Sequence, residues 1–207
     1  PTCWENYCPK NFSNFYQGQT TLIESFKNSS NIVPIKISYQ FGLKKIVNLA
    51  NKFGIKYKKD LSSYLPIAIG AYGDSLLNIT NAYSIINNKG QLIKPSVIKD
   101  IKSKKGKLIW ENKFVTSKII DRQIANKLNY LLENSVEGGT GLAASIEGRK
   151  IFGKTGTSDQ NKDLWFIGSI KNLTTGIWIG FDDNRATNFS SGTSANFWRT
   201  YIKSINI

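Results

Sequence analysis

The stretch Arg149–Ser158, RKIFGKTGTS, decides how the rest of the chain is interpreted. Within it, Lys154, Thr155, Gly156 and Thr157 combine one cation, two hydroxyl groups and a glycine that lets a ligand approach the main chain. A small carboxylate bound along the edge of a strand needs these groups. The same residues also fit an ordinary edge strand that a lysine protects from pairing. The surrounding sequence has to distinguish the two interpretations.

Around this stretch, apolar runs separated by turn residues predict an antiparallel meander. Strands are expected over 151–157, 164–170 and 176–181, with Asn172 in the second turn. We expect Ser194 to cap a final helix. Its apolar stripe would consist of Phe197, Trp198, Tyr201, Ile202 and Ile205.

The residues before this meander predict mainly helices. Thr21 and Glu24 have the spacing of a capping box, and the inward face of the helix they begin would be Leu22, Ile23 and Phe26. The four short polar residues 28–31 favour local hydrogen bonds over a continuing helix, so they predict a polar tip. Further helices are expected from Pro34 to Gly42, from Leu43 to Gly54 and over 76–88.

A hairpin and one more helix complete the first part of the chain. Residues 97–101 and 108–110 flank Lys104-Lys105-Gly106, which predicts a hairpin with a solvated basic tip. Asp121 is expected to cap the helix that follows. Residues 137–141, EGGTG, are expected to form a loop.

This order of elements predicts an α+β fold, with helices first, antiparallel strands after them and a closing helix over one sheet face. All 207 residues are interpreted as one unit. Residues 1–140 would form its mainly helical part, and residues 141–207 would form the sheet and the last helix. The chain is 40% hydrophobic, which is enough for a substantial core.

Composition excludes several kinds of chemistry. The chain has no histidine, so a Ser-His-Asp triad and every histidine-ligated metal site are excluded. Its net charge of +14 permits an anionic partner, but the lysines are spread along the chain with no arginine-rich run. The chain contains no methionine, so Pro1 is expected to be an internal or processed position. Cys3 and Cys8 fit either a short-loop disulfide or two free thiols.

Two polar segments carry a resemblance to a known family. Ser29-Ser30-Asn31 followed by Lys154-Thr155-Gly156 match Ser-x-Asn and Lys-Thr-Gly, two of the three signatures of penicillin-binding proteins and serine β-lactamases. The sequence around them resembles the transpeptidase domain of class A, bifunctional penicillin-binding proteins from about Trp4 to Tyr201. β-Lactamases share the short signatures without this surrounding sequence. The segments that resemble the transpeptidase domain are YQGQTTLIESFKNSSNIVPIK, AYGDSLLNITNAYSIINNKG, EGGTGLAASIEGRKIFGKTGTS, KDLWFIGSI and GIWIGFDDNR.

The resemblance implies a fold and a reaction. The fold would be that of the penicillin-binding protein and serine β-lactamase transpeptidase domain. A serine would attack the penultimate carbonyl of a peptidoglycan stem peptide ending in D-Ala-D-Ala, release the last D-Ala and pass the acyl group to an amine of a neighbouring stem. Stem peptides, the lipid-linked precursor and β-lactam antibiotics would be partners. We expect no cofactor, metal or nucleic acid.

The resemblance also assigns roles to residues. Among the catalytic residues, Lys154 would neutralise the terminal carboxylate, Ser29 would relay a proton to the leaving amine and Asn31 would hold the substrate amide. Among the substrate-binding residues, Thr155 and Thr157 would hydrogen-bond the carboxylate, and the Thr157 amide would donate into an oxyanion hole. The stem peptide would pair with this strand, to which Gly156 permits close approach.

The third signature, Ser-x-x-Lys, does not occur between Pro1 and Asn28. The single match, Ser96 to Lys99, follows Ser-x-Asn and lies in the expected hairpin strand, where side chains three positions apart point to opposite faces. We interpret it as coincidence. The chain alone is therefore expected to lack a nucleophile and to be inactive. We expect a severed piece of a larger protein, with strand 176–181 on an unpaired edge.

Other interpretations stay open at this point. A degenerate, non-catalytic homologue could bind cell wall or a partner. A serine hydrolase of the β-lactamase kind would need a nucleophile. A basic nucleic-acid binder would bind with a steep salt dependence.

From the resemblance, the location would be the periplasmic or extracytoplasmic face of the bacterial inner membrane. Membrane contact would come only through an upstream region, because the chain has no apolar run long enough to span a bilayer.

Overall fold

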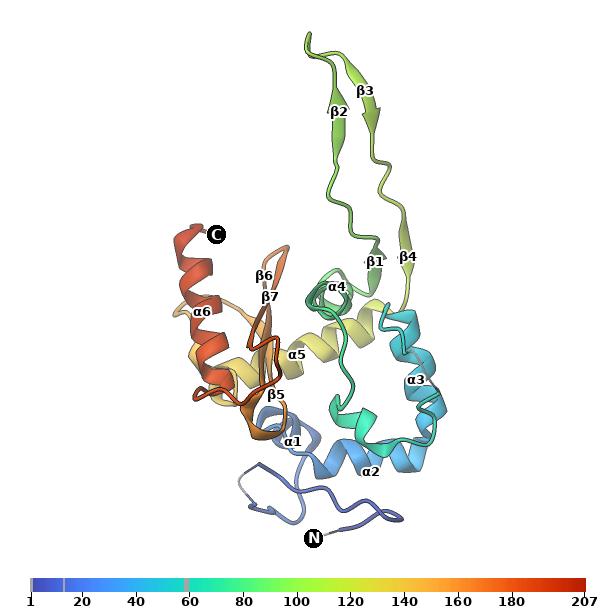
Figure 1. Ribbon diagram of the computed structural model, residues 1–207, viewed down its shortest axis with the longest axis vertical. Coiled ribbons are helices and arrows are strands. Elements are labelled where there is room, and N and C mark those ends of the chain that lie inside the picture. The colour runs from blue at the N-terminus through green and yellow to red at the C-terminus, as the bar shows by residue number, and fades with distance from the viewer. Residues whose placement is uncertain (1, 13, 58–59) are drawn as a thin grey trace.

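A computed structural model of the chain describes residues 2–12, 14–57 and 60–207 (Figure 1). The helices and 3-10 turns are α1 (Leu22–Lys27), α2 (Ile32–Phe41), α3 (Leu43–Lys52), η1 (Leu65–Ile69), α4 (Leu76–Asn87), α5 (Arg122–Gly138), η2 (Leu142–Ala144), η3 (Asp159–Asn161) and α6 (Ser191–Ser204). The strands are β1 (Gln91–Ile93), β2 (Asp100–Lys102), β3 (Leu108–Glu111), β4 (Thr116–Lys118), β5 (Phe152–Thr157), β6 (Asp163–Ile170) and β7 (Leu173–Gly180). The predicted α+β order is confirmed.

The main sheet is the antiparallel meander β5-β6-β7. Thr157 pairs with Leu164 at one end, and Ile170 pairs with Leu173 across a two-residue turn that contains Asn172. All three predicted strands are confirmed, with shifts at their ends. In the order of the described strands, β5 and β7 are both edge strands. The expected open edge along β7 is therefore present.

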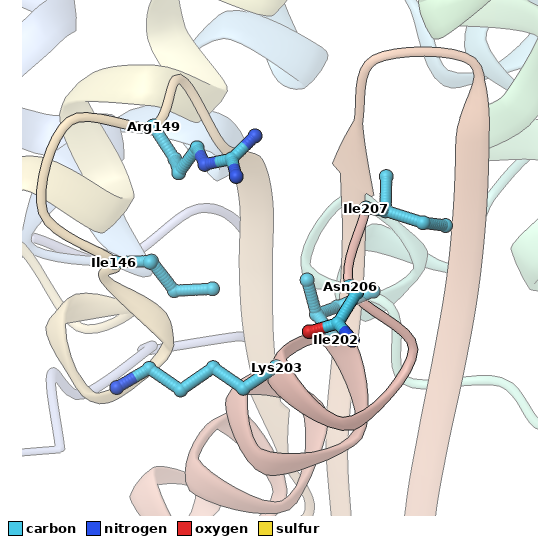
Figure 2. A pocket seen from close by; sticks show the side chains of 6 residues that line it. All are labelled: Ile146, Arg149, Ile202, Lys203, Asn206 and Ile207. Atoms are coloured by element: carbon cyan, nitrogen blue, oxygen red, sulfur yellow. The ribbon is translucent and has the colours of Figure 1, made fainter.

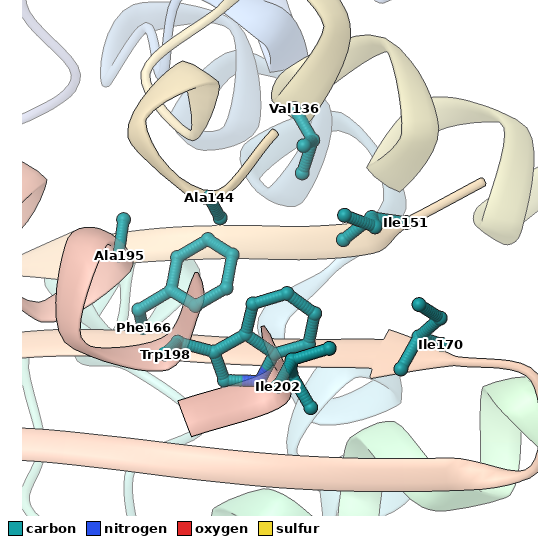
Figure 3. Packing of buried hydrophobic residues seen from close by; sticks show 8 residues of the cluster. All are labelled: Val136, Ala144, Ile151, Phe166, Ile170, Ala195, Trp198 and Ile202. Carbon is teal, nitrogen blue, oxygen red and sulfur yellow. The ribbon is translucent and has the colours of Figure 1, made fainter. Parts of the chain in front are cut away.

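Helix α6 covers one face of this sheet through a buried aromatic contact (Figure 3). Trp198 is fully buried and meets Phe166 of β6 edge-on, with 5.4 Å between ring centroids. A Cβ on Gly168 would lie 2.6 Å from Trp198, so a glycine is needed at this point of β6. The cluster around this contact consists of Val136, Ala144, Ile151, Phe166, Ile170, Ala195, Trp198 and Ile202.

Two details of the predicted last helix are wrong. Ser190, not Ser194, is the N-cap, and Ser194 lies inside α6, where its buried hydroxyl donates to the carbonyl of Leu164 at 2.9 Å. The predicted stripe is also too wide, because Phe197 is 56% exposed, whereas Trp198 and Ile202 are buried. The helix therefore rests on the sheet along a narrower face than periodicity alone suggests.

Helix α4 lies on the sheet at β6 and β7. A Cβ on Gly176 of β7 would lie 2.2 Å from the hydroxyl of Thr80 in α4 and 2.9 Å from Ile167 of β6. Close approach of the helix therefore depends on this glycine. Helix α5 packs against β5.

A second core joins the N-terminal helices. Its buried residues come from α2, α3 and the segment that contains η1, namely Ile35, Leu43, Val47, Leu61, Leu65 and Ile67.

Thr21 caps α1 by accepting a hydrogen bond from the amide of Glu24 at 3.2 Å, as predicted. The expected inward face of α1 is partly wrong, because Leu22 is 54% exposed and Ser25 is the buried residue.

The predicted hairpin is a long arm that projects from the body (Figure 1). The pair β2 and β3 forms its outer half, and a further pair, β1 and β4, forms its base. The match Ser96 to Lys99 lies between β1 and β2, outside any strand, so the expected strand geometry is wrong there. The Ser96 hydroxyl bonds locally to the main chain of Ile98.

Two further expectations change at α5. Asp121 takes the N-cap position without a side-chain capping bond. The helix continues to Gly138, so the expected loop over 137–141 is shorter and begins at Gly139.

At the other end of the chain, Cys3 and Cys8 form a disulfide. It lies in the described residues before α1, which we call the N-terminal strap.

Candidate functional site

The structure brings the polar tip after α1 next to strand β5. Ser29 adopts a left-handed backbone conformation with φ of 53°, in which its side chain meets Lys154. The two residues are 125 positions apart in sequence, and their side chains are 2.8 Å apart. The two signature segments of the sequence analysis therefore belong to one site.

Lys154 is held by three neutral oxygens. Its ammonium group donates to the Ser29 hydroxyl at 2.8 Å, to the Thr155 carbonyl at 3.2 Å and to the Thr140 hydroxyl at 3.4 Å. The ring of Phe26 lies 5.9 Å from the same nitrogen. Among the described residues, no carboxylate forms an ion pair with Lys154. The positive charge is therefore oriented without being neutralised.

Burial changes the acidity of this lysine. Desolvation lowers the pKa of Lys154 to about 8, because the surrounding protein atoms hold water away from the ammonium group. The group is still mostly protonated at pH 7. An anion that binds beside it would favour the charged form and raise the pKa again.

Thr155 does not point the same way as Lys154. Alternation along β5 places their side chains on opposite faces. The buried Thr155 hydroxyl donates to the Thr140 hydroxyl at 2.7 Å. Because this bond already uses the hydroxyl hydrogen of Thr155, its predicted contact with a carboxylate would require that bond to break.

Gly156 and Thr157 are the last two residues of β5. A Cβ on Gly156 would lie 3.3 Å from the side chain of Trp165 of β6. The glycine therefore leaves no side chain on this face of the strand. The side chain of Thr157 is exposed. β5 pairs with β6 alone among the described strands, so its outer edge lacks a strand partner, which is what strand addition by an extended peptide requires.

Asn31 is engaged with the N-terminal strap. Its side-chain amide donates to the carbonyl of Lys10 at 2.7 Å, and its main-chain amide donates to the Asn11 side chain at 2.9 Å. Asn11 also accepts a bond from the Ser30 hydroxyl at 3.4 Å. To hold a substrate amide, the Asn31 side chain would use its oxygen or exchange the bond to Lys10.

Sequence reasoning missed two residues of this site, Thr140 and Asn11. Thr140 lies within the glycine-rich segment EGGTG, whose glycines were the available signal. Asn11 lies in an irregular segment whose only signal was its polar, turn-rich composition. Both residues act through tertiary contacts that neither periodicity nor spacing shows.

Two hollows of the surface lie away from Lys154. One, of about 180 Å³, is bounded by the end of α6 and the loop before β5, where Arg149 and Lys203 line it together with Ile146, Ile202, Asn206 and Ile207 (Figure 2). Another, of about 260 Å³, lies among α2, α3 and η1. Neither is lined by the residues around Lys154.

Comparison with known proteins identifies the class to which this fold and site belong. The family described as penicillin binding protein transpeptidase domain matches residues 2–200. The chain is 36% identical over 191 residues to penicillin-binding protein 1A of Clostridium tetani and 30% identical over 200 residues to that of Rickettsia prowazekii. Each alignment covers 86% of this chain, which spans about a quarter of the length of these relatives. The chain belongs to the penicillin-binding protein transpeptidase family.

Solved structures agree with this assignment. The crystal structure of penicillin-binding protein 1A from Haemophilus influenzae superposes with a TM-score of 0.86 at 26% identity, over 95% of this chain and 36% of that one. The PonA1 protein of Mycobacterium tuberculosis, solved in complex with penicillin V, gives a TM-score of 0.83 at 19% identity, over 95% of this chain and 59% of that one. The predicted transpeptidase fold is thus confirmed.

Proposed function

We propose that this chain supplies the wall of a D,D-transpeptidase site that binds the carboxylate of the substrate and relays a proton. The substrate would be a peptidoglycan stem peptide that ends in D-Ala-D-Ala. The observation that carries the proposal is the un-neutralised ammonium group of Lys154, held by three neutral oxygens beside an open strand edge. Such a group attracts a carboxylate without first having to release an internal one.

Ser29 is suited to move a proton to the leaving amine. Its hydroxyl oxygen accepts a hydrogen bond from Lys154, which leaves its own hydrogen free to donate. When the peptide bond to the last D-Ala breaks, the departing amine takes up a proton. Ser29 would hand over its hydrogen and be reprotonated from Lys154, whose pKa of about 8 lies close to neutral pH.

The stem peptide would lie along the free edge of β5. Gly156 permits close approach there, and the exposed hydroxyl of Thr157 would bind the carboxylate together with Lys154. The Thr157 amide would donate to the oxyanion. Asn31 would hold the substrate amide from the opposite side of the site.

The acylated serine would come from outside these 207 residues, since Ser-x-x-Lys does not precede Ser29. With that serine in place, β-lactams would acylate the complete site as mimics of D-Ala-D-Ala. The reaction would take place on the extracytoplasmic side of the membrane, where peptidoglycan is assembled. In the part of the chain that the structure describes, every helix is too short or too polar to cross a bilayer.

Binding of a short peptide tests the carboxylate role. We expect an acetylated D-Ala-D-Ala peptide to shift the NMR signals of β5, and the same peptide with an amidated C-terminus to bind much more weakly. Lys154→Ala should weaken binding of the acid about 10- to 100-fold, because a hydrogen bond to a charged group is worth about 1.5–3 kcal/mol. Unchanged affinity in this variant would remove the proposed role.

Lys150→Ala is the matched control. Lys150 is four residues upstream, its side chain is exposed, and it pairs with Glu133 at 3.2 Å. Its removal should leave peptide binding unchanged, whereas equal losses in both variants would indicate a general charge effect.

Fluorescent penicillin supplies a covalent readout. It should label the gene product that also contains a Ser-x-x-Lys segment and should leave the 207-residue chain unlabelled.

A further inference from the structure

The loop between α5 and η2 lies against both parts of the site. The main-chain amide of Thr140 donates to the carbonyl of Lys27 at 3.1 Å, at the last residue of α1 and two positions before Ser29. A Cβ on Gly139 would lie 2.3 Å from the same carbonyl. This end of α1 therefore packs directly on the main chain of the loop, and the position of the Ser29 tip is tied to that of Thr140.

The side chain of Thr140 contacts the other part of the site. Its hydroxyl oxygen accepts hydrogen bonds from the Thr155 hydroxyl at 2.7 Å and from the Lys154 ammonium group at 3.4 Å. These two donors belong to neighbouring residues whose side chains leave β5 on opposite faces. One threonine hydroxyl therefore bonds the side chains of two consecutive β5 residues, and the main chain of the same threonine bonds the end of α1.

We propose that Thr140 is a positioning residue that holds the ammonium group of Lys154 against Ser29. A threonine hydroxyl has two acceptor lone pairs and one hydrogen, so it can accept from both donors at once. Because it is neutral, it orients the cation without neutralising it. A carboxylate at the same place would form an ion pair with Lys154 and compete with the substrate.

The proposal predicts a change in the acidity of Lys154. An acceptor that bonds the ammonium group favours the charged form, so its removal should lower the pKa. We expect Thr140→Val, which has nearly the same shape but no hydroxyl, to lower the pKa of Lys154 by about one unit. Thr140→Ser keeps the hydroxyl and should retain the original value. Ser29→Ala removes a bond of 2.8 Å and should lower it further than Thr140→Val does.

Chemical labelling of the 207-residue chain measures this pKa without any ligand. A trace of isotopically labelled acetic anhydride reacts with each free amine at a rate that follows its deprotonated fraction. Complete acetylation in denaturant with the other isotope then allows each lysine to be read by mass spectrometry. Lys150, whose side chain is exposed, is the internal standard, and its profile should be the same in every variant.

The outcomes are distinct. A lower midpoint in Thr140→Val together with the original midpoint in Thr140→Ser supports the proposal, and an unchanged midpoint in Thr140→Val overturns it. If circular dichroism shows that Thr140→Val does not fold, Thr140→Ala replaces it under the same criterion, because alanine also lacks the hydroxyl group. The significance of Thr140 for turnover rests on the proposed function. The labelling experiment does not depend on the proposed function, because it measures the pKa of Lys154 without a ligand. A failure of peptide binding and a failure of this inference are therefore separate results.

Discussion

At the scale of single residues, the site depends on one lysine whose hydrogen-bond partners are all neutral. Three neutral oxygens accept hydrogen bonds from the Lys154 ammonium group, and desolvation brings its pKa to about 8. Charge and orientation are therefore set by different groups: the surroundings set the acidity, and Ser29 and Thr140 set the direction. Such a lysine changes its charge close to the pH at which cells work.

This acidity predicts a pH dependence of binding. Lys154 is mostly protonated below pH 8 and loses its charge as the pH rises through 8. A peptide carboxylate should therefore bind almost constantly from pH 6 to about 7.5 and then progressively more weakly, with a slope that approaches about tenfold per unit above pH 8. Titration calorimetry with acetylated D-Ala-D-Ala measures the profile. Lys154→Arg stays charged throughout and should give a flat profile. A bend that persists in this variant would assign the titration to another group.

At the scale of elements, α6 is attached to the sheet by few residues. Trp198 fills the space above Gly168 and meets Phe166, whereas its neighbour Phe197 points outward. Ser194 adds a buried hydrogen bond to the carbonyl of Leu164. Helix α6 thus stabilises the β6 strand, to which β5 and its site residues are paired.

A pair of aromatic substitutions on α6 tests this. Trp198→Ala should lower the free energy of unfolding by about 3–5 kcal/mol, the usual cost of emptying a buried aromatic site. Phe197→Ala, on the same helix, should change it by less than about 0.5 kcal/mol because the ring is largely exposed. Urea denaturation followed by tryptophan fluorescence and circular dichroism measures both. Similar losses in the two variants would contradict the packing of α6 described above.

The same elements show what sequence could predict. The three strands of the meander and the helices before them followed from alternation and from stop signals such as Gly42 and Gly54. Ser194 was mistaken for a cap because a serine before an apolar stripe has the same pattern whether its hydroxyl bonds its own helix or a strand far away. The convergence of Ser29 and Lys154 came from family resemblance, because no local pattern joins residues 125 positions apart.

At the scale of the whole molecule, the arm built from β1 to β4 stands apart from the body that carries the site (Figure 1). Strands β2 and β3 pair with each other, and Ile101, Ile109 and Trp110 are exposed on them. Six of the arm's lysines, at 94, 99, 102, 104, 105 and 107, lie between β1 and β3. Its outer half should therefore contribute little to the stability of the body.

Shortening the arm tests this independence. Replacing residues 101–110 with Asn-Gly joins Asp100 to Glu111, which already face each other, through a two-residue turn. We expect the melting temperature to change by less than about 2 °C. The shortened chain should also be more soluble, because exposed apolar side chains are removed. Loss of cooperative unfolding would show that the arm packs on the body after all.

The contact between Ser29 and Lys154 also has a kinetic consequence. During synthesis the tip after α1 emerges early, and β5 follows only after more than a hundred further residues. Bringing such distant residues together costs loop-closure entropy before their contact adds any stability. The arm, α4 and α5 all belong to that intervening chain. We therefore expect the geometry of the ammonium group to be among the last features to appear in folding, and the acidity of Lys154 to serve as a measure of complete folding.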